Sequence, residues 1–344
     1  MNGLKGLATG VGSLPFQDAQ KAVDLILRYL PCAPFWPQLP KRDMREGMIA
    51  QFSENLPGLK FDGQTLRFIA QDKEKELELF YERFIAQDLA YFQISPSFAK
   101  GLYAFYQRVK DADLSGVKFI KCQVTGPFTF CSGINDRSGN SILYDKVLMQ
   151  AMATGLSMKA LWQLDLFKRF GKKMIMFFDE PYLSCVGSAY TPVNRNEVIG
   201  VFSELADRIK VKGCLVGIHC CGNTDWSMLM DADCIDIINF DAFDFQERFV
   251  LYADNLNSFL KKGGIICWGI VPTQGYSASL RPEELSQKIK TGIDILVKKG
   301  IDRQLLLERL MISPACGLGT LDEQKVEGIL SLLSQTSEFI RKTL

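Results

Sequence analysis

The sequence predicts an α/β fold in which residues 1–344 form a single domain, one (β/α)8 barrel with an N-terminal insertion. Short apolar runs that end in Gly, Pro, Asp or Ser alternate with helical patterns along the chain, and this alternation is typical of a parallel sheet. Eight such runs are present, which is the number of strands in a TIM barrel. Length alone would also allow two domains, but 344 residues fit one barrel, since such barrels span about 200 to more than 400 residues.

Eight segments are predicted as strands because they are short, apolar and bounded by turn-forming residues. In chain order these segments are Gly6–Ser13, Leu89–Ile94, Val117–Thr125, Lys173–Phe178, Leu215–His219, Ile235–Phe240, Gly264–Ile270 and Leu310–Ser313.

Helices are predicted where apolar residues recur at spacings of three and four. One helix begins at Ala19, and Thr320 and Glu323 are predicted as the capping box of the last helix, which extends to about Arg341. The other helical patterns cover Glu74–Gln87, Ser141–Phe170, Asn196–Lys212, Glu247–Lys262 and Glu283–Lys299.

Residues 31–70 are irregular and rich in Pro, Gly and Gln. This stretch is too long for a connector, so it is predicted to be a functional loop or an insertion. Its charged residues Arg42, Arg45 and Glu46 are interpreted as solvated, with substrate contact as the alternative. The competing fold, an open doubly wound sheet, usually has a glycine-rich turn after its first strand. The only candidate turn, Thr9–Ser13, lacks the third glycine.

Composition narrows the classes of function. The chain has 40 Lys and Arg against 39 Asp and Glu, a net charge of +1, which does not favour nucleic acid or an acidic membrane surface as a partner. No stretch reaches the roughly 18 apolar residues of a spanning helix, and the N-terminus lacks the apolar run of a signal peptide. We therefore expect a cytoplasmic protein, in which the ten cysteines are reduced thiols or metal ligands.

Polar residues are concentrated where the predicted strands end. Because the carboxyl ends of parallel strands open on one face of a barrel, and barrel active sites lie on that face, these residues are expected to converge. They are Ser13, Thr125, Asp179, Glu180, His219, Cys221, Asp241 and Cys316.

His219 is the only histidine of the chain and is followed by two cysteines. Zinc binds imidazole nitrogen and thiolate sulfur in tetrahedral geometry. Residues i and i+2 of a strand share a face, which favours Cys221 over Cys220 as the partner of His219. Asp241 and Cys316, after later strands, would complete the zinc site. The alternative is that the lone histidine is a hydrogen-bonded core residue.

Asp179 and Glu180 form an acidic pair at the end of another strand, before Pro181. Such a pair can hold a substrate ammonium group or transfer a proton, so both residues are predicted as catalytic. The alternative is a pair of carboxylates that stabilises a helix N-terminus.

Six segments resemble the catalytic domain of cobalamin-independent methionine synthase, within the superfamily that includes uroporphyrinogen decarboxylase and methylcorrinoid–thiol methyltransferases. The resemblance implies that zinc is held by His219, Cys221, Asp241 and Cys316. It also implies that Val11, Gly12, Ser13 and Asp179 bind an amino-acid substrate. The matching segments are Val11–Pro15, Thr125–Thr129, Asp179–Leu183, His219–Cys221, Ile238–Asp241 and Ser313–Leu318.

Three departures from the family pattern bear on the methyl donor. Asp241 stands where the family has Glu, the chain is about half the length of the folate-dependent enzyme, and residues 267–274 lack the histidine thought to donate a proton. Folate nitrogen releases a methyl group poorly unless it is protonated, whereas a methylcorrinoid needs no such acid. We therefore expect the short core form of the family, with a methylcorrinoid protein, or else folate, as the donor.

The resemblance thus predicts a zinc-dependent methyltransferase that acts on a small thiol, with homocysteine first and coenzyme M second. Zinc suits this reaction because only the thiolate attacks, and bound zinc deprotonates a coordinating thiol. The alternatives are a decarboxylase of porphyrinogen type, which needs no metal, and a scaffold protein with a closed structural zinc site.

Overall fold

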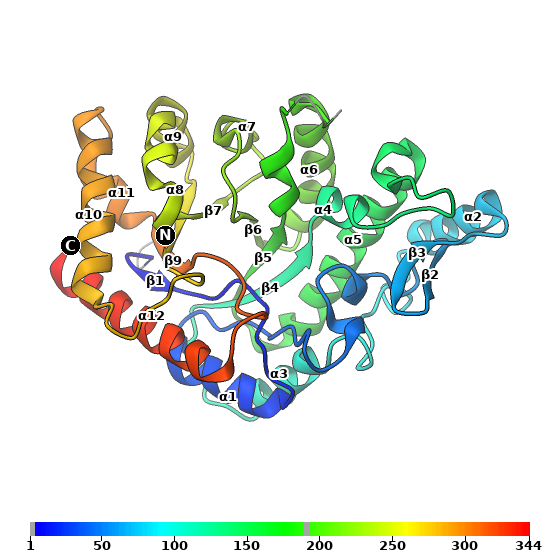
Figure 1. Cartoon of the computed structure of the whole chain (residues 1–344), viewed down its shortest axis with the longest axis horizontal. Coiled ribbons are helices and arrows are strands. Elements are labelled where there is room, and N and C mark those ends of the chain that lie inside the picture. Colours follow the sequence, from blue (N-terminus) through cyan, green and yellow to red (C-terminus); the bar gives the residue numbers. More distant parts are fainter. Residues whose placement is uncertain (1–3, 189–190, 192) are drawn as a thin grey trace.

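The computed structural model describes residues 4–188, 191 and 193–344, and a curled parallel sheet of seven strands forms its centre (Figure 1). The strand order in the sheet is β1-β9-β8-β7-β6-β5-β4. The strands are β1 (Leu7–Ala8), β4 (Phe119–Thr125), β5 (Lys173–Asp179), β6 (Leu215–Cys220), β7 (Ile237–Asp241), β8 (Ile265–Val271) and β9 (Leu310–Pro314). Because both faces of the sheet are covered, these strands are almost continuously apolar, and the sequence signal for them is strong.

An extended segment of residues 32–38 lies between the two edge strands of the sheet. Phe35 forms an isolated parallel bridge with Lys121 of β4, and Gln38 forms one with Ser13, beyond the end of β1. Backbone hydrogen bonds support both contacts, from Lys121 N to Pro34 O at 2.9 Å and from Leu14 N to Gln38 O at 2.9 Å. The architecture is therefore TIM-barrel-like, although regular strand pairing among the described residues stops at seven strands.

Seven of the eight predicted strands are confirmed, and the strand predicted at Leu89–Ile94 is wrong. That segment consists of turns, in which Tyr91 N donates to Asp88 O. Its apolar residues anchor the turns in the core, and the rings of Phe80 and Phe92 are 5.7 Å apart. A short apolar run has the same composition in either structure, so periodicity cannot distinguish them.

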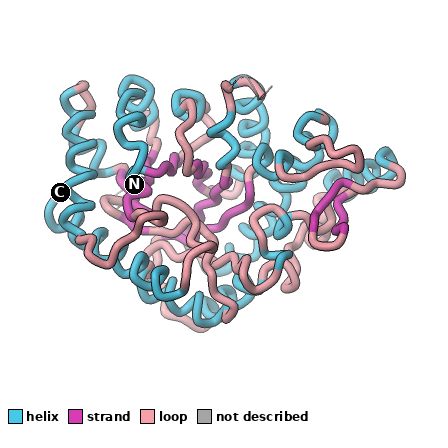
Figure 2. Tube along the Cα trace, viewed as in Figure 1, coloured by secondary structure: helices cyan, strands magenta, loops and turns pink. Residues whose placement is uncertain are grey.

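Helices surround the sheet, as the cyan tubes in Figure 2 show. The longer ones are α1 (Ala19–Tyr29), α3 (Lys100–Lys110), α5 (Lys146–Phe167), α6 (Arg195–Lys210), α8 (Ala242–Phe249), α9 (Ala253–Lys261), α10 (Pro282–Lys298) and α12 (Glu323–Thr343). The shorter ones are α4 (Pro127–Ser132), α7 (Trp226–Met230) and α11 (Arg303–Glu308). Among the described residues, no helix combines the length and apolar character needed to cross a bilayer.

A hairpin and a helix extend from one side of the barrel-like body (Figure 1). They are β2 (Leu59–Asp62), β3 (Thr65–Phe68) and α2 (Lys73–Ile85). The hairpin belongs to the stretch predicted as an irregular insertion. Its short strands are only half apolar, which explains why the sequence pattern missed them.

Two helix predictions need correction. The capping box predicted at Thr320 and Glu323 is wrong, because Asp322 is the N-cap of α12 and accepts a hydrogen bond from Lys325 N at 2.8 Å. Asp is among the best N-cap residues, so it displaces the Thr two positions earlier. The single helix predicted over residues 247–262 is interrupted, since α8 ends at Phe249 and α9 begins at Ala253.

A compact apolar layer fills the inner face of the sheet. The residues of this cluster alternate along the strands with residues that pack against the helices, so they face inward. Further along the same strands, the same alternation places Asp179, Asn239 and Asp241 on the inner face. The inner face of the sheet is therefore apolar along most of each strand and polar near the carboxyl ends of the strands. The apolar cluster contains Leu7, Phe119, Ile175, Phe177, Ile237, Ile265, Cys267 and Met311, among others.

Candidate metal and thiol site

A cavity of about 940 Å³ opens at the carboxyl ends of the strands. Seven of the predicted site residues line it, and Gly12 and Glu180 do not. Its lining includes Val11, Ser13, Glu46, Asp179, His219, Cys221, Asp241, Asp244, Thr273, Gln274 and Cys316. Residues far apart in the chain thus meet where active sites of parallel barrels lie.

His219, Cys221 and Cys316 form one cluster in this cavity. Each offers one ligand atom, and these three atoms lie within 4.8 Å of one another. His219 belongs to β6, Cys221 follows that strand by one residue, and Cys316 follows β9. Cys220 lies on the other face, where it is buried and its Sγ contacts Gly222 O at 3.5 Å. Strand alternation therefore selects Cys221 for the cluster.

A hydrogen-bond chain orients the imidazole of His219. Asn239 Nδ2 donates to Cys267 O at 2.8 Å and to Ser313 Oγ at 2.9 Å, so its Oδ1 is the acceptor that faces His219 Nδ1 at 2.7 Å. This arrangement places the proton on Nδ1 and leaves the lone pair on Nε2. Nε2 is buried and makes no hydrogen bond of good geometry. An oriented imidazole with a free Nε2 is the usual form of a metal-binding histidine.

The two cysteines of the cluster affect each other's protonation. The hydrogen bond with Cys316 lowers the pKa of Cys221, whereas the same contact and burial raise the pKa of Cys316. Burial lowers the pKa of His219, but Cys316, Asp179 and Asn239 outweigh it and raise that pKa overall. The cluster therefore places two sulfurs of unequal acidity beside an imidazole. These soft donors fit zinc, and three protein ligands are typical of catalytic zinc sites.

Asp241, the predicted fourth ligand, lies in the same cavity but outside this cluster. Its Oδ1 accepts a hydrogen bond from Asp244 N at 3.0 Å, which makes Asp241 the N-cap of α8. Burial raises the pKa of Asp241, and the backbone hydrogen bond from Asp244 partly offsets this. Its role as a metal ligand stays a prediction.

The side chains of Asp179 and Glu180 point in different directions, one into the cavity and one toward α4. Asp179 lines the cavity, and its Oδ1 is buried and has no hydrogen-bond partner. The Glu180 carboxylate binds the N-terminal turn of α4, where it accepts from Phe128 N at 2.9 Å and from Thr129 N at 2.8 Å. Consecutive residues at a strand end point to opposite faces, so the geometry favours the helix-stabilising alternative for Glu180.

Lys121 lies inside the barrel-like sheet, below the cavity. It is fully buried, and its Nζ donates to Val11 O and, at 3.2 Å, to Gln123 Oε1. The ammonium group also lies 5.1 Å from the ring centroid of Phe177. Burial lowers the pKa of Lys121 to about 8, opposed by the charge of Asp179, while burial raises the pKa of Asp179, opposed by Lys121 and then His219. Lys121 thus supports both Asp179 and the backbone that carries Val11.

Glu46 is a further acidic residue of the cavity, and substrate contact was the alternative that the sequence left open for it. It ends a short 3-10 helix (Met44–Glu46), is 0% exposed and lines the cavity. Its Oε1 accepts from Arg42 Nε at 2.5 Å, while its Oε2 has no partner. The interpretation of Glu46 as a solvated charge is therefore wrong, whereas its partner Arg42 is partly exposed. Their spacing of four residues was the available signal for a pair.

Ser13 holds the turn that carries Cys316. Its carbonyl oxygen accepts from Leu318 N at 2.9 Å and its Oγ accepts from Gly319 N at 3.2 Å. A Cβ atom at Gly317 would come within 2.4 Å of Ser13 Oγ, so glycine is required for this close approach. Ser13 therefore helps to fix the backbone turn that carries Cys316.

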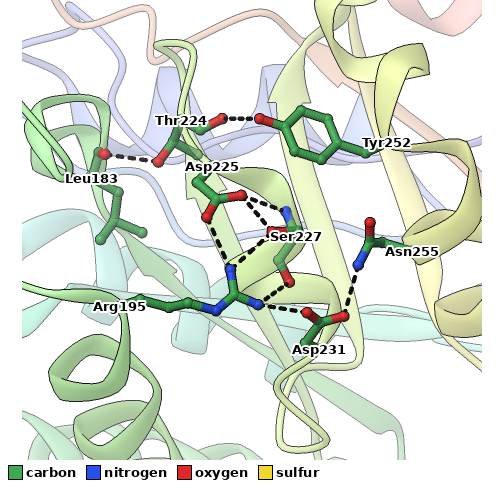
Figure 3. A network of polar contacts seen from close by, with 8 residues as sticks. All are labelled: Leu183, Arg195, Thr224, Asp225, Ser227, Asp231, Tyr252 and Asn255. Atoms are coloured by element: carbon green, nitrogen blue, oxygen red, sulfur yellow. Dashed lines mark hydrogen bonds and ion pairs between the residues drawn. The ribbon is translucent and has the colours of Figure 1, made fainter.

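A surface network holds the loop that follows Cys221 (Figure 3). Arg195, at the start of α6, binds Asp225 at 2.9 Å and Asp231 at 2.5 Å. Thr224 Oγ1 donates to Leu183 O at 2.7 Å, which ties this loop to the segment after Asp179. The network fixes the two loops that frame the cluster relative to each other.

Comparison with known proteins adds to this picture. No family model matches the sequence, and no curated protein is similar to it in sequence. A structure from a Shewanella species, described as a B12-independent methionine synthase in complex with selenomethionine, has 17% identity and a TM-score of 0.60, covering 98% of each chain. A structure from Listeria monocytogenes, described as a "putative vitamin-B12 independent methionine synthase", has 13% identity and a TM-score of 0.53, covering 94% of this chain and 85% of the other. At these identities the likeness concerns architecture, and at that level the resemblance inferred from the sequence motifs is confirmed: over nearly its whole length the chain folds like structures described as B12-independent methionine synthases.

Proposed function

We propose that the protein transfers a methyl group to the sulfur of a small amino-acid thiol, homocysteine, to form methionine. The observation that carries this proposal is the cluster of His219, Cys221 and Cys316 in a cavity of about 940 Å³ at the strand ends. The architecture shared with methionine synthase structures supports it independently. The cavity leaves room for a thiol substrate and for the reactive part of a methyl donor.

The donor atoms of the cluster fit a zinc ion, which we propose as the resident metal. Zinc bound by His219 Nε2 and the two sulfurs would deprotonate an incoming thiol and keep it nucleophilic. Within the protein, Asn239 keeps the His219 ring oriented through Nδ1, and Ser13 keeps Cys316 in place. We retain Asp241 as a candidate fourth ligand, which would have to contribute its other oxygen while it caps α8.

Two carboxylates are proposed to bind the ammonium group of the substrate. Asp179 and Glu46 both line the cavity, and each has one buried oxygen without a partner. A buried acceptor without a partner is unfavourable, so it is suited to a ligand that brings a donor. Coenzyme M carries a sulfonate and no amine, so these acids favour homocysteine over coenzyme M. Val11 and Ser13 remain the proposed contacts to the rest of the amino acid.

The proposed methyl donor is a methylcorrinoid, with folate as the alternative. His219 is the only histidine of the chain, and its Nε2 is assigned to the metal, so no imidazole is left to protonate a folate nitrogen. Thr273 and Gln274 line the cavity after β8 instead. This favours a methylcorrinoid as donor. The structures of similar fold are described as B12-independent, which argues for folate instead, so the test includes both donors.

The test is methyl transfer by the zinc-loaded protein. Homocysteine is supplied with either methylcobalamin or methyltetrahydrofolate, and methionine is measured by mass spectrometry, with coenzyme M as the competing thiol. We expect methionine with methylcobalamin and little methylated coenzyme M. A protein that binds stoichiometric zinc but methylates no thiol from either donor would overturn the proposed function. Loss of carboxyl groups from a porphyrinogen would instead support the decarboxylase alternative.

Asn239→Leu is expected to lower the affinity for zinc by about 10–100-fold, the usual effect of removing the group that orients a metal-binding histidine. The variant loses the acceptor at His219 Nδ1, so the ring is free to turn and to exchange its tautomer. Zinc affinity is measured by competition with a chromophoric chelator. Asn255→Leu is the control, because Asn255 contacts Asp231 at one end of the network of Figure 3 and does not line the cavity. Equal zinc affinity in the two variants would show that Asn239 does not orient a ligand.

A further inference from the structure

Arg42 and Glu46 form an ion pair in which the acid is buried and the base is partly exposed. Glu46 is completely buried, and the Arg42 side chain is 26% exposed. Glu46 lines the large cavity, whereas Arg42 lines a second cavity of about 520 Å³, bordered by α1 and α3. The pair therefore lies between the two cavities, with the cation on the side away from the predicted thiol site.

The contacts that Arg42 and Lys100 make with the Glu46 carboxylate involve the same oxygen. Oε1 accepts from Arg42 Nε at 2.5 Å and from Lys100 N at 3.3 Å, and Arg42 Nη2 also contacts it. Oε2 is buried and has no partner among the described residues. The guanidinium thus occupies one oxygen and leaves the other available. A side-on Arg contact of this kind differs from the bidentate pairing that would use both oxygens.

The ionisation of Glu46 depends on this contact. Burial raises the pKa of Glu46, and the hydrogen bond and charge of Arg42 are the largest opposing influences. The amides of Lys100 and Leu39 also oppose burial. Arg45 also interacts with Glu46, but only through its charge. Its guanidinium is hydrogen-bonded to Asp43 and also interacts with the charge of Glu54. Without Arg42, burial would dominate, and the carboxyl group would stay protonated to a higher pH.

We propose that Arg42 is a positioning residue that holds Glu46 through Oε1, so that Oε2 accepts the ammonium group of an amino-acid ligand. Arg42 itself touches no ligand. This inference rests on the proposed function, because it assumes that an amino-acid thiol or its methylated product occupies the large cavity. It also makes the amine, rather than the sulfur alone, part of what the cavity recognises.

The test compares two ligands that differ only in the amine, L-methionine and 4-(methylsulfanyl)butanoate. Their binding to the metal-free protein is measured by calorimetry, so neither zinc nor a methyl donor is needed. Arg42→Gln is expected to weaken methionine binding by about tenfold at neutral pH, a typical effect for one charge-assisted hydrogen bond. Binding of the amine-free acid is expected to change less than about twofold. Arg42→Lys keeps the charge and should restore part of the affinity.

Arg45→Gln is the matched control, because it removes the same charge one turn away, from a residue that pairs with Asp43 at 2.7 Å. It should bind methionine like the wild type. The pH profile provides a second measurement, since loss of methionine affinity between pH 8 and pH 6 should be greater in Arg42→Gln than in wild type. Equal weakening of both ligands, or equal behaviour of the two arginine variants, would overturn the inference. Methionine binding that follows this pattern without any methyl transfer would uphold it and refute the proposed function.

Discussion

Replacing Cys316 by serine is expected to reduce zinc affinity by more than about a hundredfold and to abolish thiol methylation. Removal of a group that merely orients a ligand costs about 10–100-fold, and loss of a sulfur ligand removes a whole bond. Serine is nearly isosteric with cysteine but binds zinc poorly at neutral pH. Cys221→Ser should have the same effect, because both sulfurs belong to the cluster. Zinc content after dialysis and the rate of methionine formation are the two measurements.

Two further variants make this prediction specific. Cys220→Ser alters the neighbouring cysteine, which is buried on the opposite face, and should retain zinc. Asp241→Asn should lower zinc affinity by about tenfold or less, because the three clustered ligands remain and the carboxylate lies outside their cluster. If Cys220→Ser loses zinc and Cys316→Ser retains it, the proposed metal centre is wrong. If Asp241→Asn loses zinc as completely as Cys316→Ser, Asp241 is a ligand.

Asp179→Asn is expected to raise the KM for homocysteine by about 10–100-fold, with zinc content unchanged. Asp179 Oδ1 is buried and unpartnered in the cavity, and a hydrogen bond to a charged group contributes about 1.5–3 kcal/mol, where each 1.4 kcal/mol corresponds to a factor of ten. Asparagine keeps the size of the side chain but removes the charge that attracts an ammonium group. Steady-state kinetics with homocysteine, together with zinc analysis, separate substrate binding from metal loss.

Asp244→Asn is the comparison for Asp179, since Asp244 also lines the cavity but belongs to the first turn of α8. Its KM should stay within about threefold of the wild type. A thiol without an amine should also react equally well with wild type and Asp179→Asn. An unchanged KM in Asp179→Asn, or the same increase in both variants, would exclude Asp179 as the ammonium site.

Local patterns in the sequence determined most of the central sheet. Strands β4 to β9 are apolar runs whose ends coincide closely with the predicted ones, because a strand covered on both faces has a strong and purely local signature. Alternation along β6 also selected His219 and Cys221, which share a face, and excluded Cys220. The same rule, applied to Asp179 and Glu180, would have shown that only one of the two can face the cavity.

Only the tertiary structure decided how the remaining segments meet this sheet. Residues 32–38 occupy the place in the sheet that was predicted for Leu89–Ile94. Glu46 is buried and paired with Arg42, and the Asp241 carboxylate caps α8. The sequence does not specify these outcomes. The spacing of Arg42 and Glu46 indicates a pair but not its burial, and the other two outcomes depend on a partner distant in the chain or on a competing hydrogen bond. Periodicity specifies which face a side chain occupies, whereas the partner across that face is set by the packing of the whole chain.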